Sequence, residues 1–178
     1  MILEFNSFYL DAIQEKDAWG ICDFIVANQD RFKLYLPKTV AQNLIPDLSR
    51  LFVEKKVKEF HKKEELLFTL KEKETNKLAG LIYLKNFDWD KKQGEFAYCI
   101  GYEFKGKEII SNVVLELINY ANKTLGLTSF QIIAHKTNLA SVKVAENCGF
   151  KWSKTLVNGF TPTGGNPLDM EIYDLKTS

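Results

Sequence analysis

Several features that would place the protein in a specialised class are missing from its sequence. Only three cysteines and two histidines occur in 178 residues. Cys22, Cys99 and Cys148 are widely spaced and set among apolar residues, which predicts neither a disulfide framework nor a zinc site. His61 and His135 each lack ligating residues at metal-binding spacing, so no metal is expected.

Long apolar runs and an excess of one charge are missing as well. No stretch reaches the length of a membrane-spanning helix, and residues 1–6 lack the basic and apolar regions of a signal peptide. The 24 Lys and Arg residues against 23 Asp and Glu give a net charge of +1, so no overall field would attract nucleic acid or an anionic membrane. A cytoplasmic location is therefore expected, in keeping with the scattered cysteines.

What is present is the composition of an ordinary globular protein, with 46% hydrophobic and 26% charged residues. The length suffices for a substantial core without disulfides. The sequence contains no internal repeat, low-complexity tract or Pro/Gly-rich linker. One domain spanning residues 1–178 is therefore predicted.

Hydrophobic periodicity predicts an alternation of strands and helices. Asp17 is a candidate cap for the first helix, and Gly126 a candidate end for the third. This order predicts an α+β fold with a mostly antiparallel sheet and one parallel crossover. The expected strands are residues 8–13, 66–70, 78–84, 95–100, 130–134, 151–157 and 168–175, and the expected helices are residues 17–28, 47–61, 108–125 and 139–147.

Some of these segments carry more detailed expectations. Residues 130–134 are predicted to be buried on both faces of the sheet, and residues 158–167 to form a loop. The charge run 54–59 mixes both signs, which favours a solvated helix face over a nucleic-acid patch. In the helix that contains this run, the expected buried stripe is Leu48, Leu51, Phe52 and Phe60. In the helix after Lys107 it is Ile109, Ile110, Val113, Val114, Leu117, Ile118 and Ala121.

A basic turn at residues 102–107 leads directly into the longest amphipathic helix. Lys105, Gly106 and Lys107 therefore lie at a helix N-terminus. Unpaired N–H groups and the positive end of the helix dipole meet at such a position, which suits an anion.

At this point the sequence resembles the GNAT acetyltransferase superfamily, and specifically its RimJ/RimL-like ribosomal-protein N-terminal acetyltransferase branch. Residues 94–101, 104–111 and 138–150 carry the resemblance, and weaker likeness extends across nearly the whole chain. The Asn-x-Ala-Ser…Glu-x-x-Gly-Phe pattern from Asn138 to Phe150 is the most specific element. The resemblance implies a GNAT-like fold, with flanking helices and a splayed pair of parallel strands.

The resemblance also implies acetyl-CoA as co-substrate, bound where strands 95–100 and 130–134 separate. The separated edges offer backbone groups to the pantetheine chain and the acetyl carbonyl. The pyrophosphate would lie on residues 105–111. The cofactor-binding set implied in this way is Tyr98, Cys99, Ile100, Lys105, Gly106, Lys107, Glu108, Ile109, Ile110, Ser111, Asn138 and Ser141.

Three residues are the main candidates for catalysis, and Glu95 matches a carboxylate position common in this branch. Glu95 is the candidate base that removes a proton from the amine, and Ser141 the candidate donor to the departing thiolate. Tyr98 is a candidate acid, as is Tyr173. Each candidate also has a purely structural explanation. Asn138 and Ser141 have the spacing of a helix cap, and Glu95 could be an exposed strand residue. The two tyrosines could be core residues.

The acceptor is expected to be a primary amine, either a protein N-terminus or a small molecule. An α-amine costs about 1 kcal/mol to deprotonate at neutral pH, whereas a lysine side chain costs about 4.6 kcal/mol, so one base favours N-termini. Phe32, Tyr35 and Phe160 are candidates for lining the acceptor pocket. No nucleic acid or membrane partner is expected, and a homodimer remains open.

The turn departs from the family signature Gln/Arg-x-x-Gly-x-Gly/Ala. Glu108 replaces a glycine, and Ile110 replaces a small residue. A positive φ at position 108 would cost glutamate about 1 kcal/mol or more. Its carboxylate about 6 Å from a phosphate would add repulsion of up to about 3 kcal/mol. The alternative is therefore a degenerate, non-catalytic domain that binds a CoA-like ligand or a protein.

Overall fold

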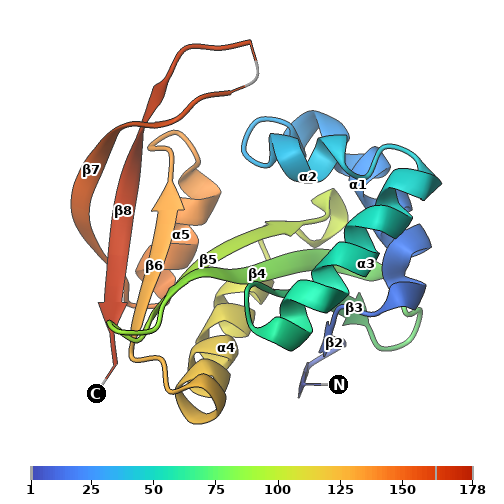
Figure 1. Cartoon of the computed structure of the whole chain (residues 1–178), viewed down its shortest axis with the longest axis horizontal. Coiled ribbons are helices and arrows are strands. Elements are labelled where there is room, and N and C mark those ends of the chain that lie inside the picture. Colours follow the sequence, from blue (N-terminus) through green and yellow to red (C-terminus); the bar gives the residue numbers. More distant parts are fainter. Residues whose placement is uncertain (1, 163, 178) are drawn as a thin grey trace. The chain divides into compact units, whose positions relative to one another are not determined.

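Fifteen elements follow one another in the computed structural model of the chain, which describes residues 2–162 and 164–177 (Figure 1). Strands and helices alternate, as the periodicity predicts. The strands are β1 Leu3–Phe5, β2 Phe8–Ala12, β3 Leu66–Glu72, β4 Leu78–Asp88, β5 Gln93–Ile100, β6 Ser129–Ala134, β7 Lys151–Phe160 and β8 Leu168–Lys176. The helices are η1 Glu15–Asp17, α1 Ala18–Phe32, α2 Pro37–Ala41, α3 Pro46–Lys62, η2 Tyr102–Phe104, α4 Ile109–Leu125 and α5 Leu139–Asn147.

The strands are hydrogen-bonded in the order β1-β2-β3-β4-β5-β6-β8-β7. Strands β5 and β6 run parallel, with α4 as the connection between them, whereas the β1/β2, β2/β3, β6/β8 and β7/β8 pairs are antiparallel. The prediction of an α+β fold with a mostly antiparallel sheet and one parallel crossover is confirmed.

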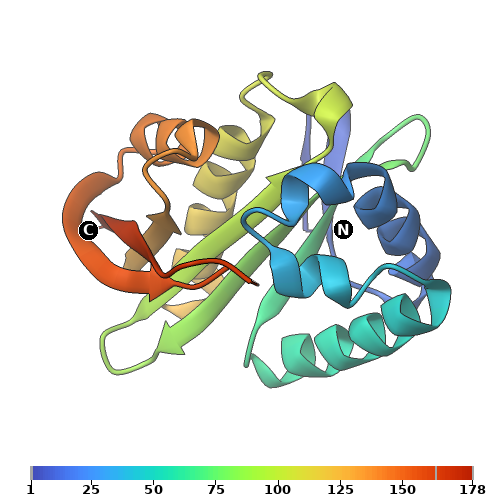
Figure 2. The ribbon, with the colours of Figure 1, turned by 90° about the horizontal axis from the view of Figure 1, so that it is seen from above.

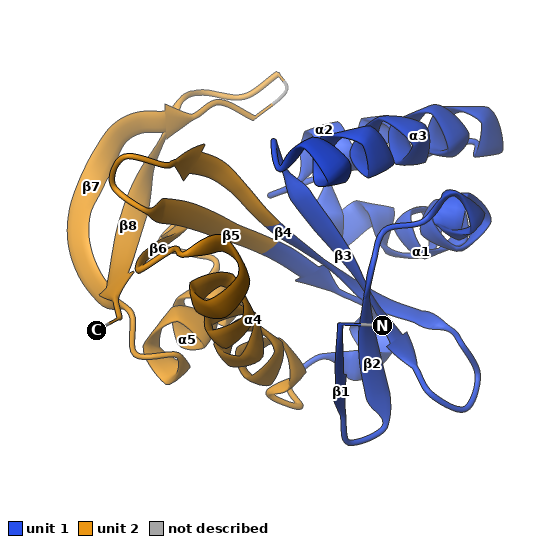
Figure 3. Cartoon of the chain, turned by 60° about the horizontal axis from the view of Figure 1, so that its bottom comes forward, with its two compact units in different colours: residues 1–83, 98–105 blue, residues 84–97, 106–178 orange. Residues whose placement is uncertain are grey.

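The chain divides into two compact units (Figure 3). Unit 1 comprises residues 1–83 and 98–105, and unit 2 comprises residues 84–97 and 106–178, so β4 and β5 each contribute to both. Within the part of the chain that the structure describes, none of the helices is long and apolar enough to cross a membrane.

Unit 1 packs its helices beside a strongly apolar set of strands. Helices α1 and α3 contact each other, and Figure 2 shows them side by side in blue and teal. In α3, Phe52 is buried as predicted, but Leu48 and Leu51 are 39% and 53% exposed, so their expected burial is wrong. Ser49 and Val53 lie inside instead, because the helix turns its 49/52/53 side toward the core.

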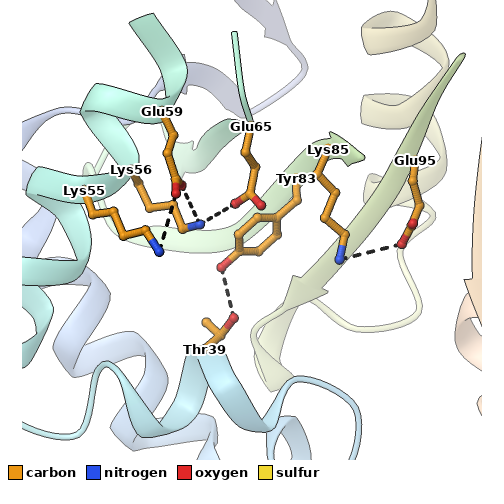
Figure 4. A network of polar contacts seen from close by, with 8 residues as sticks. All are labelled: Thr39, Lys55, Lys56, Glu59, Glu65, Tyr83, Lys85 and Glu95. Carbon is orange, nitrogen blue, oxygen red and sulfur yellow. Dashed lines mark hydrogen bonds and ion pairs between the residues drawn. The ribbon is translucent and has the colours of Figure 1, made fainter. Parts of the chain in front are cut away.

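The charge run of α3 is only partly a solvated face. The Lys56 ammonium lies 2.8 Å from Glu59 and 2.6 Å from Glu65, and its side chain is 12% exposed (Figure 4). Lys56 also lies over the Phe52 ring at 5.7 Å from its centroid. The aliphatic stem therefore covers apolar surface while two carboxylates satisfy the charge.

Asp17 precedes α1 as predicted, but its side chain does not cap that helix. One carboxylate oxygen accepts the N–H of Gln14 at 2.9 Å, and the other lies 2.6 Å from the buried Lys71 ammonium. The capping prediction for Asp17 is therefore wrong, because a buried cation on β3 and a local turn take both oxygens. Helix α2, which begins at Pro37, was not predicted because five residues are too few for a periodic signal.

Unit 2 is built around α4, whose predicted apolar stripe is buried throughout. Gly126 ends the helix with φ 70°, as expected of a left-handed C-terminal residue. Strand β6 alternates, however: Phe130, Ile132 and Ala134 are buried, whereas the residues between them are half-buried. The prediction that both its faces are buried is wrong, because Ser129, Gln131 and Ile133 on the second face are only partly buried.

The C-terminal hairpin is longer than predicted. Strand β7 continues through residues 158–160, which the sequence assigned to a loop, with irregular pairing to β8 after Trp152 and Leu156. Asn158 adopts φ 53° and its N–H donates to Asp169 at 2.9 Å. The bulge at Asn158 allows the strand to continue through this segment, although its Asn and Gly predicted a turn.

Candidate active site

The parallel strands β5 and β6 stop pairing with each other before they end. Their register runs from Gln93 opposite Ser129 to Phe96 opposite Ile132, while β5 continues to Ile100 and β6 to Ala134. Beyond Phe96 the strand carries backbone donors and acceptors that the parallel ladder does not use. Such an edge can pair with an extended polar ligand.

The turn before α4 has the geometry of an anion-binding loop. Gly106 has φ 77° and Glu108 has φ 55°, and the helix begins at Ile109. A left-handed residue followed by a helical one directs successive N–H groups toward one point. Lys105, Gly106, Lys107 and Glu108 are exposed, whereas Ile109, Ile110 and Ser111 in the first turn of the helix are buried.

Glu108 occupies the left-handed conformation that a glycine adopts without strain. Its Cβ in that region costs about 1 kcal/mol or more, which is the first of the two costs inferred from the sequence. The side chain is exposed, which allows the carboxylate to remain in water. The turn therefore carries one strained backbone residue immediately before α4.

The start of α5 is fixed by Asn138. Its Oδ1 accepts the N–H of Ser141 at 3.3 Å, so the predicted N-cap is confirmed. Both side chains are half-buried at this helix start. A cap of this kind holds the first turn of α5 in place, and it leaves any ligand contact by these residues as a prediction.

A thiol joins the two helices of unit 2. Cys148, which follows α5, donates its S–H to the carbonyl of Ser111 in the first turn of α4 at 3.4 Å. Burial raises the pKa of the Cys148 thiol to about 11. The contact therefore joins the C-terminal end of α5 to the first turn of α4, and the thiol that forms it is uncharged.

Glu95, the candidate base, lies within a polar cluster of unit 2. Asn86 donates to its carboxylate at 2.7 Å, and the Lys85 ammonium lies 3.6 Å away (Figure 4). The Glu95 side chain is 15% exposed. The Asn86 amide and the Lys85 ammonium together hold the Glu95 carboxylate in one orientation.

Two residues of α1 that the sequence analysis did not assign hold the end of β5 in unit 1. Arg31 donates to the Ile100 carbonyl at 3.5 Å and to Asn28 Oδ1 at 3.3 Å, and its guanidinium lies 5.7 Å from the Tyr102 ring centroid. Asn28 Oδ1 also accepts the Tyr102 N–H at 3.1 Å. Residues 28–31 are all polar, so the sequence pattern did not single out Asn28 and Arg31.

The remaining candidates differ in exposure. Cys99 is buried, which raises its thiol pKa to about 12, and Tyr98 is half-buried. Desolvation, and then the charges of Glu171 and Glu146, raise the pKa of Tyr173. The raised pKa values keep the Cys99 thiol and the Tyr173 hydroxyl protonated at neutral pH, so Tyr173 stays a candidate proton donor.

The three aromatic candidates for the acceptor pocket lie in different surroundings. Phe32 is buried and packs against Phe24 in the core of unit 1, at 5.4 Å between ring centroids. Tyr35 is 40% exposed in the turn after α1, and Phe160 is half-buried at the end of β7 in unit 2. Their roles remain predictions. Among the described residues, no three His, Cys, Asp or Glu side chains gather as metal ligands.

Comparison with known proteins identifies the family. Residues 8–151 match the acetyltransferase (GNAT) domain. The chain is 31% identical to the "Putative ribosomal N-acetyltransferase YdaF" of Bacillus subtilis (strain 168) over 146 residues, which cover 78% of this chain and 74% of that protein.

Solved structures show the same fold. The ribosomal-protein-S5-alanine acetyltransferase of Vibrio fischeri superposes with a TM-score of 0.91, at 19% identity and coverage of 99% of this chain and 96% of that one. The ribosomal L7/L12 α-N-protein acetyltransferase RimL, solved with coenzyme A, gives a TM-score of 0.89 at 17% identity, with coverage of 99% and 97%. The predicted resemblance and GNAT-like fold are confirmed, and this chain belongs to the GNAT acetyltransferase family as an enzyme that transfers acetyl groups.

Proposed function

We propose that this acetyltransferase moves the acetyl group of acetyl-CoA to the α-amine of a protein N-terminus, with a ribosomal protein as the leading acceptor. The 31% identity to a protein named for ribosomal N-acetylation, over most of both chains, carries this proposal. The lower cost of deprotonating an α-amine supports it, because a single candidate base serves that acceptor better than a lysine side chain.

The phosphate end of the cofactor is assigned to unit 2. Gly106–Ser111 present helix-start N–H groups, and Lys107 adds positive charge. Strand β5 supplies backbone groups of Tyr98, Cys99 and Ile100 to the pantetheine and acetyl portions, and Lys105 adds a second cation. The end of the β5/β6 ladder at Phe96 supports this role, since an oxyanion at the acetyl carbon is stabilised by a fixed N–H.

The chemistry is direct transfer in a ternary complex. Glu95 accepts the proton that the ammonium must lose, the amine nitrogen bonds to the acetyl carbon, and the carbon–sulfur bond breaks. Ser141 or Tyr98 gives its proton to the departing thiolate and takes up the second proton, which the nitrogen loses as the amide forms. Burial raises the thiol pKa of Cys99 to about 12 and of Cys148 to about 11, which argues against a cysteine carrying the acetyl group.

Two measurements on the purified protein test this function. Calorimetric titration with acetyl-CoA should show saturable binding, and mass spectrometry should find an added acetyl group on the α-amine of N-terminal peptides from ribosomal proteins. A peptide with a blocked α-amine and a free lysine is the matched control. Absence of both acetyl-CoA binding and CoA release against a panel of amines would overturn the proposal.

Acetylation of the blocked peptide, or of spermidine in place of any N-terminal peptide, would keep the enzyme class and replace the acceptor. That outcome would direct attention to a polyamine or another small amine, the acceptor class that the sequence leaves open.

The strained Glu108 favours one alternative, a domain that binds a CoA-like ligand or a protein without turnover. Acetyl-CoA binding without acetyl transfer to any amine would support it, and turnover would exclude it. The proposed location is the cytoplasm, where ribosomal proteins and reduced cysteines occur together; a homodimer is the assembly to test by sedimentation.

A further inference from the structure

A pocket of about 290 Å³ lies within unit 1, at the N-terminal end of α1 and beside β2 and β3. None of the residues predicted for acetyl transfer lines it. Its lining comes from β2, η1, α1, β3, and the turn and first residue of β4. Three features of this lining point to a ligand: a buried cation, further hydrogen-bond donors and a helix position without a side chain.

The buried cation is Lys71, whose side chain is 9% exposed. Its ammonium donates to Asp17 at 2.6 Å, and its remaining described contact is with the Tyr9 ring, at 5.9 Å from the centroid. An ammonium carries three donors, so two N–H groups lack an acceptor among the described residues. An acceptor on a ligand would satisfy them in a place where unpaired donors are costly.

Two more donors surround the pocket. Lys16 forms no ion pair with any residue in the described ranges. The hydroxyl of Tyr9 donates to Asn76 Oδ1, which leaves the Asn76 amide N–H groups without a described acceptor. The Asp17 carboxylate is already engaged by Lys71 and the Gln14 N–H. The pocket therefore presents mainly donors and a positive charge.

The helix position without a side chain is Gly20, the third residue of α1. A Cβ built there would meet no heavy atom within 4 Å, so no packing contact requires a glycine. Glycine weakens a helix relative to alanine, yet here it leaves the side of the pocket open. Leu78 and the Tyr9 ring add apolar surface to the lining.

We propose that this pocket binds a small organic monocarboxylate. The carboxylate contacts Lys71, Lys16 and the Asn76 amide, and the apolar body lies against Tyr9 and Leu78. Two lysines and one aspartate leave one positive charge, which matches a monoanion. A dianion such as a phosphate monoester would be repelled by Asp17, since that carboxylate lies beside the Lys71 ammonium. This inference does not depend on the acceptor proposed above.

The test is an NMR titration of the ¹⁵N-labelled full chain with benzoate, and with benzamide and phenyl phosphate as neutral and dianionic probes. Benzoate should give saturable shifts of the Lys16, Gly20 and Leu78 amides, and the other two probes should bind at least about tenfold more weakly. Equal binding of benzamide, tighter binding of phenyl phosphate, shifts confined to other residues, or no saturation would each overturn the proposal.

Two variants confirm the location. Gly20→Leu fills the open side without changing a charge and should abolish benzoate binding, whereas Val26→Leu, at an exposed position of the same helix, should leave it unchanged. The double variant Asp17→Asn/Lys71→Met removes both buried charges together and should lose benzoate binding while its amide spectrum stays folded. Undiminished binding by folded Gly20→Leu would contradict the assigned pocket.

Discussion

The ammonium of Lys85 lies 3.6 Å from the carboxylate of Glu95, and the two side chains come from the paired strands β4 and β5. This contact helps to orient the Glu95 carboxylate, as a base requires. Replacing Glu95 with Gln should lower kcat/KM by about 10²-fold or more, with acetyl-CoA affinity unchanged. Steady-state kinetics with an N-terminal peptide measure both quantities.

Glu103→Gln is a matched control for that experiment, because Glu103 is also paired with a lysine, Lys77, but is half-exposed and outside the proposed site. Its kcat/KM should equal that of the unmodified chain. Full activity of Glu95→Gln would remove Glu95 as the base, and would leave a water relay or another residue for that role.

Removal of the Glu108 side chain should strengthen cofactor binding, because its carboxylate repels the pyrophosphate. Glu108→Gly places a residue that tolerates φ 55° at the helix start and removes a negative charge near the pyrophosphate. We expect acetyl-CoA to bind about tenfold more tightly, equivalent to about 1.4 kcal/mol. Isothermal titration calorimetry measures the change.

Glu108→Gln separates the two contributions, because it keeps the strained side chain and removes the charge. A gain in Glu108→Gly alone identifies the backbone as the cause. An unchanged Kd in both variants would mean that the side chain lies in solvent away from the phosphate, and that the strain is the same with and without ligand.

Loss of the Asn138 cap should destabilise unit 2. Asn138→Ala removes the acceptor for the Ser141 N–H and should lower the free energy of unfolding by about 1 kcal/mol. Asn138→Asp keeps a capping oxygen and should unfold at nearly the same urea concentration. If Asn138→Asp is stable yet inactive, the amide has a role in acetyl transfer beyond capping.

The buried pair Lys71–Asp17 should respond very differently to single and double substitution. Lys71→Met leaves the Asp17 carboxylate buried without its cation, and we expect a loss of about 3–5 kcal/mol in the free energy of unfolding. The double variant Asp17→Asn/Lys71→Met should recover most of that loss. Chemical denaturation measures both, and equal stability of the single and double variants would contradict the pairing.

The free energy of unfolding should fall at alkaline pH, because the Cys148 thiol is buried in the folded chain. Burial raises the Cys148 thiol pKa from 9.0 to about 11, so the unfolded chain loses this proton first as the pH rises. The stabilisation is complete below pH 9 and is lost as the pH approaches and passes the folded value near 11. Urea denaturation from neutral pH to that value should show it.

Cys148→Ala provides the control, since it removes this titration while other groups remain. Its free energy of unfolding should decline less steeply with pH across the same interval. An identical slope in both proteins would place the Cys148 thiol in contact with water.

Local patterns were enough to predict most elements. The stripe of α4 recurs on one face over many turns, and Asn138 and Gly126 are residue types with well-defined terminal roles, so helix positions followed from nearby residues. Leu48 and Leu51 were misassigned because several apolar residues of α3 compete for one buried face. Which of these residues become buried depends on the elements packed against the helix.

The candidate site shows the same division. The sequence by itself determined the family, the phosphate turn and the substitution of glycine by Glu108, because these are read from adjacent residues. Only the tertiary structure decided that Glu108 is left-handed, that Arg31 binds the Ile100 carbonyl and that Lys71 takes the oxygen expected to cap α1. Such contacts join residues far apart in the chain, and residue order alone does not specify which distant groups meet.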